Sequence, residues 1–402
     1  MKKIDVLVQD TVVGELFFEK ELNQYGFNYL SDIAPISLIM PYQKSTYMWK
    51  NKLHPIFDMN TPEGYLFEVF KNLLHKEHSY IDDFLIFSYL APNIESRLSF
   101  TSWFDTKKFE PVELDDVLKN DSEDTFLKIL HTFLNKNAIS GVQPKTLVLI
   151  KDKESLGTKE YIIKTWGEEY KNLAENEFFC LNATKYAGVE IPNIQLSQNK
   201  NFLLVERFNY DKESDSFLGF EEVLVLLGKN TDDKYSGSYE RVAKTVYAVT
   251  TDKLKAMKDL YKCIVMSYLL KNGDAHLKNF GILYDEEFKN IRFAPAYDIV
   301  NTCVYIYKDK PALTMFGKKL WFGENELVRF GVESCYISKA KSQKYYDECI
   351  DALKQMMGEL KEYIKVNPNF ENIGSKMQST FKISLEKKTH KELSIETTRD
   401  WN

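Results

Sequence analysis

The stretch from residue 254 to residue 298 constrains the fold more than any other part of the chain. An apolar run with helical periodicity covers 254–270, and the polar segment Asn-Gly-Asp-Ala-His-Leu-Lys-Asn follows at 272–279. Two β-like runs that turn at residues 285–286 come next, and then a further acid, Asp298. Turn propensity alone gives no reason for this order, so we expect one functional unit made of a helix, an acidic loop, a hairpin and a second acid.

Asp274 and Asn279 have the spacing that protein kinases use in their catalytic loop. There the aspartate orients the attacking hydroxyl and accepts its proton, while the asparagine oxygen holds magnesium. Asp298 stands where kinases carry a second magnesium ligand. For each residue alone, a turn or a helix cap is the simpler explanation. Together and in this order, the three residues predict one magnesium site and phosphoryl transfer.

Two more polar side chains lie inside this loop. We expect His276 to fix the loop beside the nucleotide by hydrogen bonding, because an aspartate positions a hydroxyl without help from an imidazole. Lys278 has two interpretations. Its charge faces the transferring phosphoryl group and stabilises the transition state, or it is an ordinary solvated lysine.

An upstream β-β-α-β-β order predicts the other half of a nucleotide site. Lys164 ends the second strand, and Glu177 lies on the apolar stripe of the helix. They match the strand lysine and helix glutamate that kinases pair to hold the α- and β-phosphates, with Glu175 as a rival acid and an exposed pair as the alternative. The expected runs are 146–150 and 161–164, joined by a loop at 155–157, then 173–187, 191–196 and 202–206.

The segment before these strands, residues 138–145, reads Ala-Ile-Ser-Gly-Val-Gln-Pro-Lys. It has a single glycine and therefore matches neither a Walker A loop nor the G-x-G-x-x-G loop. Its backbone N–H groups can cradle phosphate with Lys145 nearby, but an ordinary turn explains the same residues equally well.

The remaining periodicity divides the chain. We expect an α+β module at 1–108, a kinase-like small lobe at 125–208, and a helical C-terminal lobe with the catalytic loop and metal site at 209–402. Strands are predicted at 4–8, 13–18 and 36–40, helices at 62–74, 81–90, 125–134 and 345–366, a hairpin at 280–283 and 291–293, and a boundary in the charged stretch 105–124.

Composition excludes several classes of protein. The 402 residues include 53 basic and 59 acidic ones, a net charge of −6, so a generally basic nucleic-acid-binding surface is not expected. The apolar runs are too short to span a membrane, and the acid at Asp5 disfavours a signal peptide, so a cytoplasmic location is expected. The five scattered cysteines predict buried, reduced thiols, and the charged run at 376–391 a solvated helix.

Several motifs closely resemble the signatures of the HipA family of toxin kinases. They are Ile-Ser-Gly-Val-Gln-Pro-Lys at 139–145, Asn-Gly-Asp-Ala-His-Leu-Lys-Asn-Phe at 272–280 and Ala-Pro-Ala-Tyr-Asp-Ile-Val-Asn-Thr at 294–302. Segments 36–41 and 55–64 resemble the N-terminal domain of that family. The resemblance covers most of the chain in the expected order.

The resemblance implies a fold class and an activity. The fold would be α+β, a bilobal protein-kinase-like fold with a small N-terminal module and a mainly helical C-terminal lobe. The activity would be Ser/Thr protein kinase activity with ATP and Mg²⁺, arresting growth by phosphorylating a bacterial protein; better-known relatives act on aminoacyl-tRNA synthetases. The implied partner is a small helix-turn-helix antitoxin (HipB-like), through which most contact with operator DNA would occur. No membrane partner is implied.

The resemblance also assigns roles to residues. Asp274 would be the catalytic base, with Lys278 beside it, and Asn279 and Asp298 would be the magnesium ligands. Glu177 would form the structural ion pair with Lys164. The residues expected to bind ATP are Ser140, Gly141, Val142, Gln143, Lys145, Lys164 and His276, together with the hinge residues Glu206, Arg207 and Phe208.

One position departs from the family pattern. Ala138 stands where family members often carry an autophosphorylated serine, and Ser140 remains available next to Gly141. A phosphate on Ser140 would eject the loop from the ATP phosphates, so Ser140 is the candidate for autophosphorylation, with a simple turn hydroxyl as the alternative. Two other functions stay open: a small-molecule kinase, and a catalytically silent corepressor that binds an antitoxin.

Overall fold

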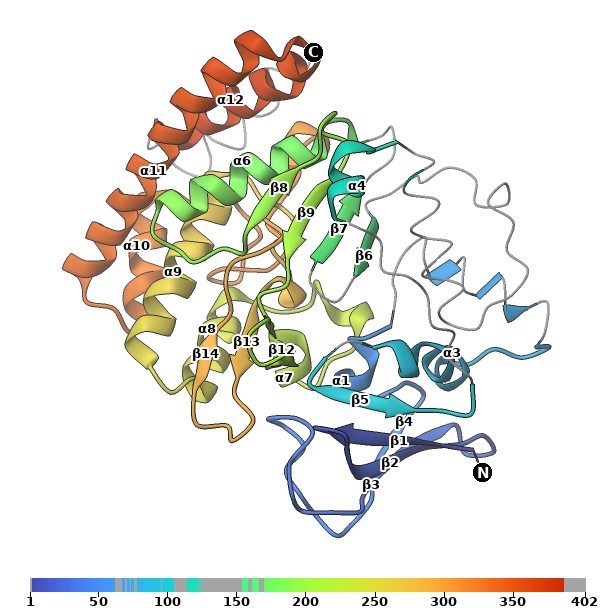
Figure 1. Cartoon of the computed structure of the whole chain (residues 1–402). Coiled ribbons are helices and arrows are strands. Elements are labelled where there is room, and N and C mark those ends of the chain that lie inside the picture. Colours follow the sequence, from blue (N-terminus) through green and yellow to red (C-terminus); the bar gives the residue numbers. More distant parts are fainter. Residues whose placement is uncertain are drawn as a thin grey trace. The chain divides into compact units, whose positions relative to one another are not determined.

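The computed structural model describes residues 2–61, 67–68, 71–72, 74–75, 78–94, 96–104, 114–122, 125, 154–157, 161–165 and 170–386. The chain forms two compact units. Unit 1 consists of Met1–Glu169, Ser197–Asp232 and Tyr284–Lys289, and unit 2 of Tyr170–Leu196, Asp233–Leu283 and Asn290–Asn402. Both units contain helices and antiparallel strands (Figure 1), which confirms the predicted α+β class.

Unit 1 begins with an antiparallel five-stranded sheet in the order β4-β3-β2-β1-β5. Ile4 lies opposite Leu16 in the β1–β2 register, and residues of β1 alternate between buried and accessible positions. The predicted small sheet is therefore confirmed for its first two strands. The five strands are β1 (Lys3–Val8), β2 (Thr11–Glu19), β3 (Gln24–Tyr29), β4 (Tyr47–Lys50) and β5 (Leu98–Thr101).

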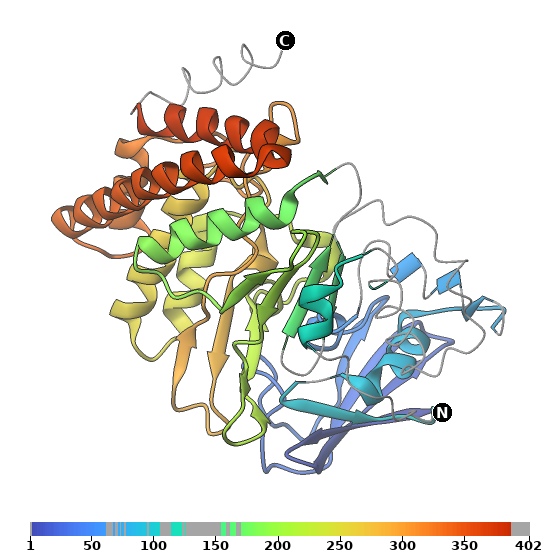
Figure 2. The same cartoon turned by 45° about the horizontal axis from the view of Figure 1, so that its top comes forward.

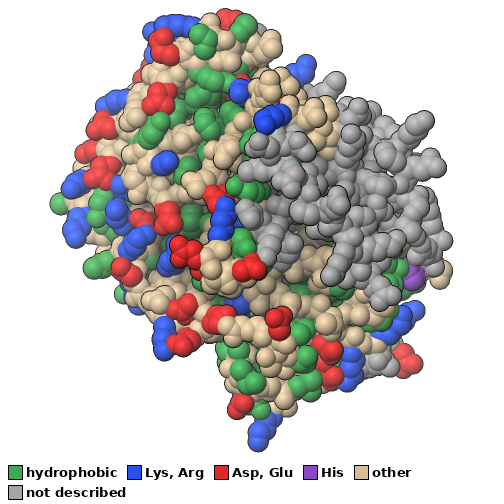
Figure 3. All heavy atoms as spheres, viewed as in Figure 1, with side chains coloured by type: hydrophobic (Ala, Val, Ile, Leu, Met, Phe, Trp, Pro, Cys, Tyr) green, Lys and Arg blue, Asp and Glu red, His purple; other side chains and the backbone are tan. Residues whose placement is uncertain are grey.

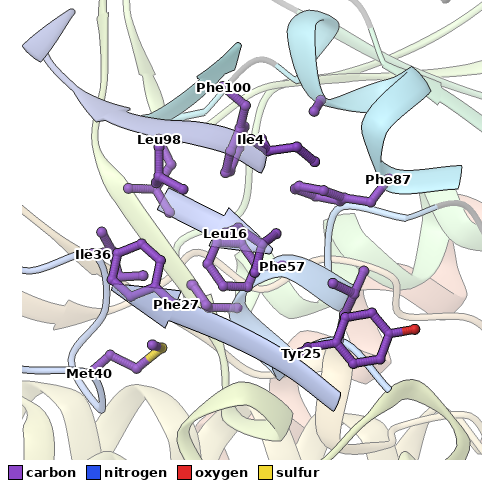
Figure 4. Close-up of a cluster of buried hydrophobic side chains, with 14 of the residues drawn as sticks. Ile4, Leu16, Tyr25, Phe27, Ile36, Met40, Phe57, Phe87, Leu98 and Phe100 are labelled. Atoms are coloured by element: carbon purple, nitrogen blue, oxygen red, sulfur yellow. The ribbon is translucent and has the colours of Figure 1, made fainter. Parts of the chain in front are cut away.

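The core of this sheet is aromatic. Helices α1 (Pro55–Asp58) and α3 (Asp83–Leu90) add Phe57 and Phe87 to the buried face of the sheet, as Figure 4 shows. The two rings lie 5.9 Å apart, and Phe100 of β5 lies 5.1 Å from Phe87. Each such side chain contributes about 1.5–3 kcal/mol by leaving water, so this cluster stabilises the module.

The predicted strand at 36–40 is wrong. Only an isolated bridge joins Ser37 and Met40. Instead, Ser37 Oγ and Leu38 N each donate a hydrogen bond of 2.8 Å to the buried carboxylate of Glu221 in β12 (Gly219–Glu222), which also accepts one of 2.7 Å from Tyr284 OH. The segment is apolar enough to be buried, but a distant carboxylate rather than a strand satisfies its polar groups.

A second antiparallel arrangement in unit 1 carries the predicted lysine. In it β7 (Tyr161–Thr165) pairs with both β6 (Glu154–Gly157) and β9 (Leu203–Glu206). Residues 155–157 are therefore part of a strand and not the predicted loop, while 146–150 lie outside the described residues. Unit 1 also contains α4 (Leu114–Lys119), α7 (Val223–Leu226), β10 (Tyr210–Asp211) and β11 (Ser216–Phe217).

Unit 2 is mainly helical, as predicted for the C-terminal part of the chain. In Figures 1 and 2, α6, α11 and α12 lie side by side. Its strands are β8 (Ile194–Leu196) and the hairpin β13 (Gly281–Tyr284) and β14 (Ile291–Phe293), of which Tyr284 belongs to unit 1. Its helices are α6 (Leu173–Tyr186), α8 (Tyr239–Val249), α9 (Lys253–Leu269), α10 (Glu324–Glu333), α11 (Lys339–Val366) and α12 (Glu371–Leu385).

The predicted helices are confirmed where the structure describes them. Those expected at 81–90, 173–187, 254–270 and 345–366 correspond to α3, α6, α9 and α11, and the hairpin is present as β13 and β14. The charged run at 376–391 is helical as far as Leu385, but it is not simply solvated, because Met377 and Phe381 are buried. Most of each of the helices predicted at 125–134 and 62–74 lies outside the described residues.

The distribution of surface charges and the state of the cysteines agree with what the composition predicts. Figure 3 shows Lys and Arg side chains interspersed with Asp and Glu over the helices of unit 2, on the face in view. The five cysteines are free and buried, as predicted, and burial raises the pKa of the Cys263 thiol to about 12. Within the described part of the chain, no helix combines the length and the apolar character needed to cross a membrane.

Candidate active site

The predicted catalytic loop lies in unit 2, between α9 and β13. Gly273 N donates to Thr302 Oγ1 at 2.8 Å, and Thr302 N donates to the carbonyl of Lys271 at 3.2 Å. A Cβ atom at Gly273 would collide with the carboxylate of Asp309 and the hydroxyl of Thr302, so any larger residue requires these side chains to shift. The loop is thus fixed at its start by residues that follow Asp298 in the sequence.

Asp274 is held by side chains and is also open to solvent. Tyr235 OH donates to Asp274 Oδ1 at 2.7 Å, and His276 Nε2 lies 3.9 Å from the same oxygen. The backbone N of Asp274 donates to Asn272 Oδ1 at 3.1 Å. The Asp274 side chain is 36% exposed. This carboxylate is oriented and accessible, as a proton acceptor for a substrate hydroxyl must be.

Asn279 and Asp298 are in direct contact, as the sequence order predicts. Asn279 lies in the short 3₁₀ turn η5 (Leu277–Asn279), where its Oδ1 accepts a hydrogen bond of 3.1 Å from His276 N. Its Nδ2 donates to Asp298 Oδ2 at 2.7 Å. His276 therefore fixes the loop through its backbone, and the loop presents its asparagine to the second acid.

The backbone at Asp298 is unusual. Its φ angle is +58°, in the left-handed region, which costs an aspartate roughly 1 kcal/mol. The neighbouring Tyr297 OH donates to the carbonyl of Lys278 at 2.6 Å and so ties this segment to the loop.

The donor atoms of this pair fit magnesium. Mg²⁺ prefers oxygen ligands and is usually bound by one or two carboxylates together with water and substrate phosphates. Asp298 can supply a carboxylate for this role, and Asn279 an amide oxygen, which accepts a hydrogen bond from His276 N while the Nδ2 of the same amide faces Asp298.

Helix α6 carries the two glutamates between which the sequence left a choice. Glu175 accepts hydrogen bonds from Asn172 Nδ2 at 2.6 Å and from Tyr363 OH of α11 at 2.8 Å, so it helps to join two helices of unit 2. Glu177 is fully buried. The contacts of Glu175 favour Glu177 as the ion-pair residue; its partner Lys164 belongs to unit 1, and the pair stays a prediction.

A buried amide links α6 to the segment that carries Asp298. Asn176 Nδ2 donates to the carbonyl of Asn301 at 3.0 Å, and Asn301 N donates back to Asn176 Oδ1 at 2.9 Å. Asn301 Nδ2 in turn donates to Thr380 Oγ1 of α12 at 2.6 Å. This network holds the acidic segment against two helices of unit 2.

Unit 1 carries the predicted lysine and hinge, and two of the three hinge residues line a cavity. Lys164 is 7% exposed in β7, and Ile162 lies on the same face two residues earlier. Ile162, Arg207 and Phe208 line a cavity of about 320 Å³, which is within the usual size range of small-molecule sites. Glu206 has its carboxylate 2.8 Å from the ammonium of Lys212.

The predicted phosphate loop is not among the described residues. Ser140, Gly141, Val142, Gln143 and Lys145 lie outside the residues that the structure describes.

Sequence reasoning missed three residues of this site, namely Tyr235, Thr302 and Asn176. The motif at 294–302 ends in Thr302, so its position after Asp298 was a usable signal. Asn176 is a polar residue on a buried helix face, and such a residue is a weaker signal of a functional role. Tyr235 lies 39 positions before its partner Asp274 in a polar segment, and nothing in the sequence marks it.

Comparisons with known proteins identify the family of the chain. Residues 4–101 match the HipA N-terminal domain and residues 137–359 the HipA-like C-terminal domain. A putative kinase of Haemophilus influenzae is 32% identical over 184 residues, which are 42% of this chain and 53% of the relative. The serine/threonine-protein kinase toxin HipA of Shewanella oneidensis is 26% identical over 194 residues, 42% of this chain and 44% of the relative. These alignments span about half the length of the curated relatives.

A solved structure resembles the whole chain. The complex of HipA, HipB and operator DNA from Shewanella oneidensis MR-1 gives a TM-score of 0.70 at 14% identity, covering 99% of this chain and 100% of that one. At this identity the likeness concerns the fold. With both family domains matched in order over most of its length, the chain belongs to the HipA family.

Proposed function

We propose that this protein is an ATP- and Mg²⁺-dependent Ser/Thr protein kinase that acts as the toxin of a toxin–antitoxin pair. The observation that carries the proposal is the contact of 2.7 Å between Asp298, which follows β14, and Asn279, which lies on the same short loop as the accessible carboxylate of Asp274. Relatives named as kinases support the same class of reaction.

In this mechanism the chain positions reactants and offsets charge. Asp274 orients the acceptor hydroxyl and takes its proton. Asn279 and Asp298 hold the magnesium ion, which, when bound, neutralises charge on the phosphates. Lys278 faces the transferring group, and Lys164 with Glu177 holds the α- and β-phosphates.

The adenine base is proposed to lie in the cavity of unit 1. Ile162 lies on the face of β7 that also carries Lys164, so base and phosphates can follow one another along that strand. The backbone of residues 206–208 would read the base, and the side chains of Arg207 and Phe208 line the cavity. The loop with Ser140, Gly141, Val142, Gln143 and Lys145 is proposed to cover the phosphates.

The partners are proposed from the family. A small helix-turn-helix antitoxin would bind the protein in the cytoplasm and make most contacts with operator DNA, as the neighbouring complex of HipA, HipB and operator DNA suggests. The target would be a bacterial protein whose phosphorylation arrests growth, with an aminoacyl-tRNA synthetase as the first candidate. Self-inhibition would work through phosphorylation of Ser140.

A labelling experiment tests the activity and its two alternatives. The purified chain is incubated with γ-labelled ATP, Mg²⁺ and bacterial lysate, next to Asp274→Asn. Labelled Ser or Thr in protein bands, lost in the variant, supports the proposal. Label only in small metabolites would favour a small-molecule kinase. Equal toxicity of both forms on expression, without labelling, would favour a silent corepressor.

A further inference from the structure

Tyr235 contacts one of the two oxygens of the carboxylate that is the proposed proton acceptor. Its hydroxyl donates to Asp274 Oδ1 at 2.7 Å, within the ideal range for an O–H donor to a carboxylate. That oxygen also lies 3.9 Å from His276 Nε2. A substrate hydroxyl that gives its proton to Asp274 must donate the same kind of hydrogen bond. The phenol therefore occupies one of the positions on the carboxylate that the substrate hydroxyl can take.

The segment that carries Tyr235 is anchored next to the catalytic loop. Leu277 N donates to the carbonyl of Lys234 at 3.1 Å, which joins the two segments through their backbones. The rings of Tyr235 and His276 meet edge to face at 5.1 Å. The contact with Asp274 is therefore built by the fold of unit 2.

Tyr235 is nevertheless able to move aside. It is 46% exposed, and the Asp274 side chain is 36% exposed. An exposed phenol changes rotamer on the picosecond to nanosecond timescale, so the hydrogen bond opens without unfolding. The phenol therefore competes for Asp274 with water, with small alcohols and with the hydroxyl of a protein substrate.

We propose that Tyr235 is a specificity-determining residue that guards Asp274 against water and small alcohols, an inference that rests on the proposed kinase function. A protein substrate gains binding energy from contacts outside the reacting hydroxyl. Part of this energy offsets the loss of the Tyr235–Asp274 hydrogen bond when the phenol is displaced. Water has no such contacts. It therefore competes poorly for the carboxylate, and ATP is conserved until a polypeptide acceptor arrives.

The guarded side reaction is ATP hydrolysis. In it the oxygen of water forms a bond to the γ-phosphorus, the bond from that phosphorus to the β,γ-bridging oxygen breaks, and ADP leaves. The proton of water passes to Asp274 and then to solvent as inorganic phosphate is released. Tyr235 takes no part in bond making, so its effect is on which acceptor reaches Asp274.

The test uses Tyr235→Phe, which removes the hydroxyl and keeps the ring. Because the phenol no longer competes for the carboxylate, phosphate release from MgATP without any protein acceptor should rise about tenfold, which is equivalent to about 1.4 kcal/mol. The ratio of phosphate release to labelling of lysate proteins with γ-labelled ATP should rise by at least this factor. A purely structural role would lower both rates, whereas the loss of a guard raises phosphate release above the wild-type rate.

Two controls make the outcome specific. Tyr247→Phe removes a hydroxyl from a comparably exposed tyrosine of unit 2, 37% exposed on α8, and should leave phosphate release unchanged. Adding Asp274→Asn to Tyr235→Phe should abolish the gain, because the gain runs through the carboxylate.

The results separate the two levels of the argument. If the wild type transfers phosphate in an Asp274-dependent manner but Tyr235→Phe releases no more phosphate than the wild type, the guard is refuted and the kinase stands. If neither protein turns over ATP in an Asp274-dependent manner, both the guard and the proposed function are refuted.

Discussion

Replacing Lys271 with methionine should stabilise the folded protein by about 2 kcal/mol at pH 7, because the lowered pKa of this buried lysine costs about 3 kcal/mol and its contact with Trp321 returns about 1 kcal/mol. Lys271 directly precedes the catalytic loop and is 2% exposed. Burial lowers the pKa of its ammonium from 10.5 to about 8, while nearby Cys303 opposes the shift. Trp321, whose ring centroid lies 4.9 Å from the ammonium, returns only about 1 kcal/mol.

The sign of the pH dependence follows from proton binding. Between pH 8 and 10.5 the unfolded chain holds the Lys271 proton and the folded chain does not, so stability rises with pH in that window. The penalty is fully present at pH 7 and shrinks as the unfolded lysine loses its proton. The advantage of Lys271→Met should therefore fall by about half between pH 7 and pH 9.5.

The assay is urea unfolding of both proteins at the two pH values, with Lys361→Met as control. Lys361 is exposed on α11, so its loss should shift the free energy of unfolding little at either pH. A variant at Lys271 that is no more stable than wild type at pH 7, or whose advantage does not shrink at pH 9.5, would refute the reasoning.

Two further substitutions test one contact of the fold and one of the loop. Glu221→Ala should destabilise unit 1 by about 3 kcal/mol or more in urea unfolding, because Ser37, Leu38 and Tyr284 lose a shared buried hydrogen-bond acceptor. A change in the free energy of unfolding under about 1 kcal/mol would contradict this. Gly273→Ala should cut phosphoryl transfer at least tenfold while circular dichroism stays native, because its methyl group meets the Asp309 carboxylate; full activity would show that the loop gives way.

Much of the fold was accessible from the sequence because its signals are local. The apolar spacing of α6, α9 and α11 predicts helices directly, and Gly188, with φ of +77°, ends the predicted helix as expected. The Asp274–Asn279 spacing and the later Asp298 were equally local signals, and the contact of Asn279 with Asp298 agrees with them.

The failures have distant causes. Residues 36–40 look like a strand, but Glu221, far along the chain, takes their hydrogen bonds. Strand β3 was missed because its pattern contains Gly26, where a side chain would collide with Phe17 across the sheet. No single sequence displays such pairings, because they exist only once the strands meet.

The charged stretch 105–124 was likewise more structured than its composition indicates. It contains α4, and its Asp121 is buried, with its carboxylate accepting hydrogen bonds from Ser197, Asn199 and Asn201. These bonds hold the pKa of Asp121 below its usual value although burial opposes them. An acid in a charged run looks solvated until its partners are known.

The central claim is that Asp274 accepts the proton while Asn279 and Asp298 hold the metal. It is tested most directly by measuring single-turnover transfer from MgATP and nucleotide affinity together in Asp274→Asn and Asp298→Asn. Asp274→Asn should keep wild-type affinity and lose about 10²–10⁴ in rate, whereas Asp298→Asn should weaken the Mg²⁺-dependent affinity. Transfer by Asp274→Asn within a few fold of wild type, or Mg²⁺-dependent binding untouched in Asp298→Asn, would contradict the account.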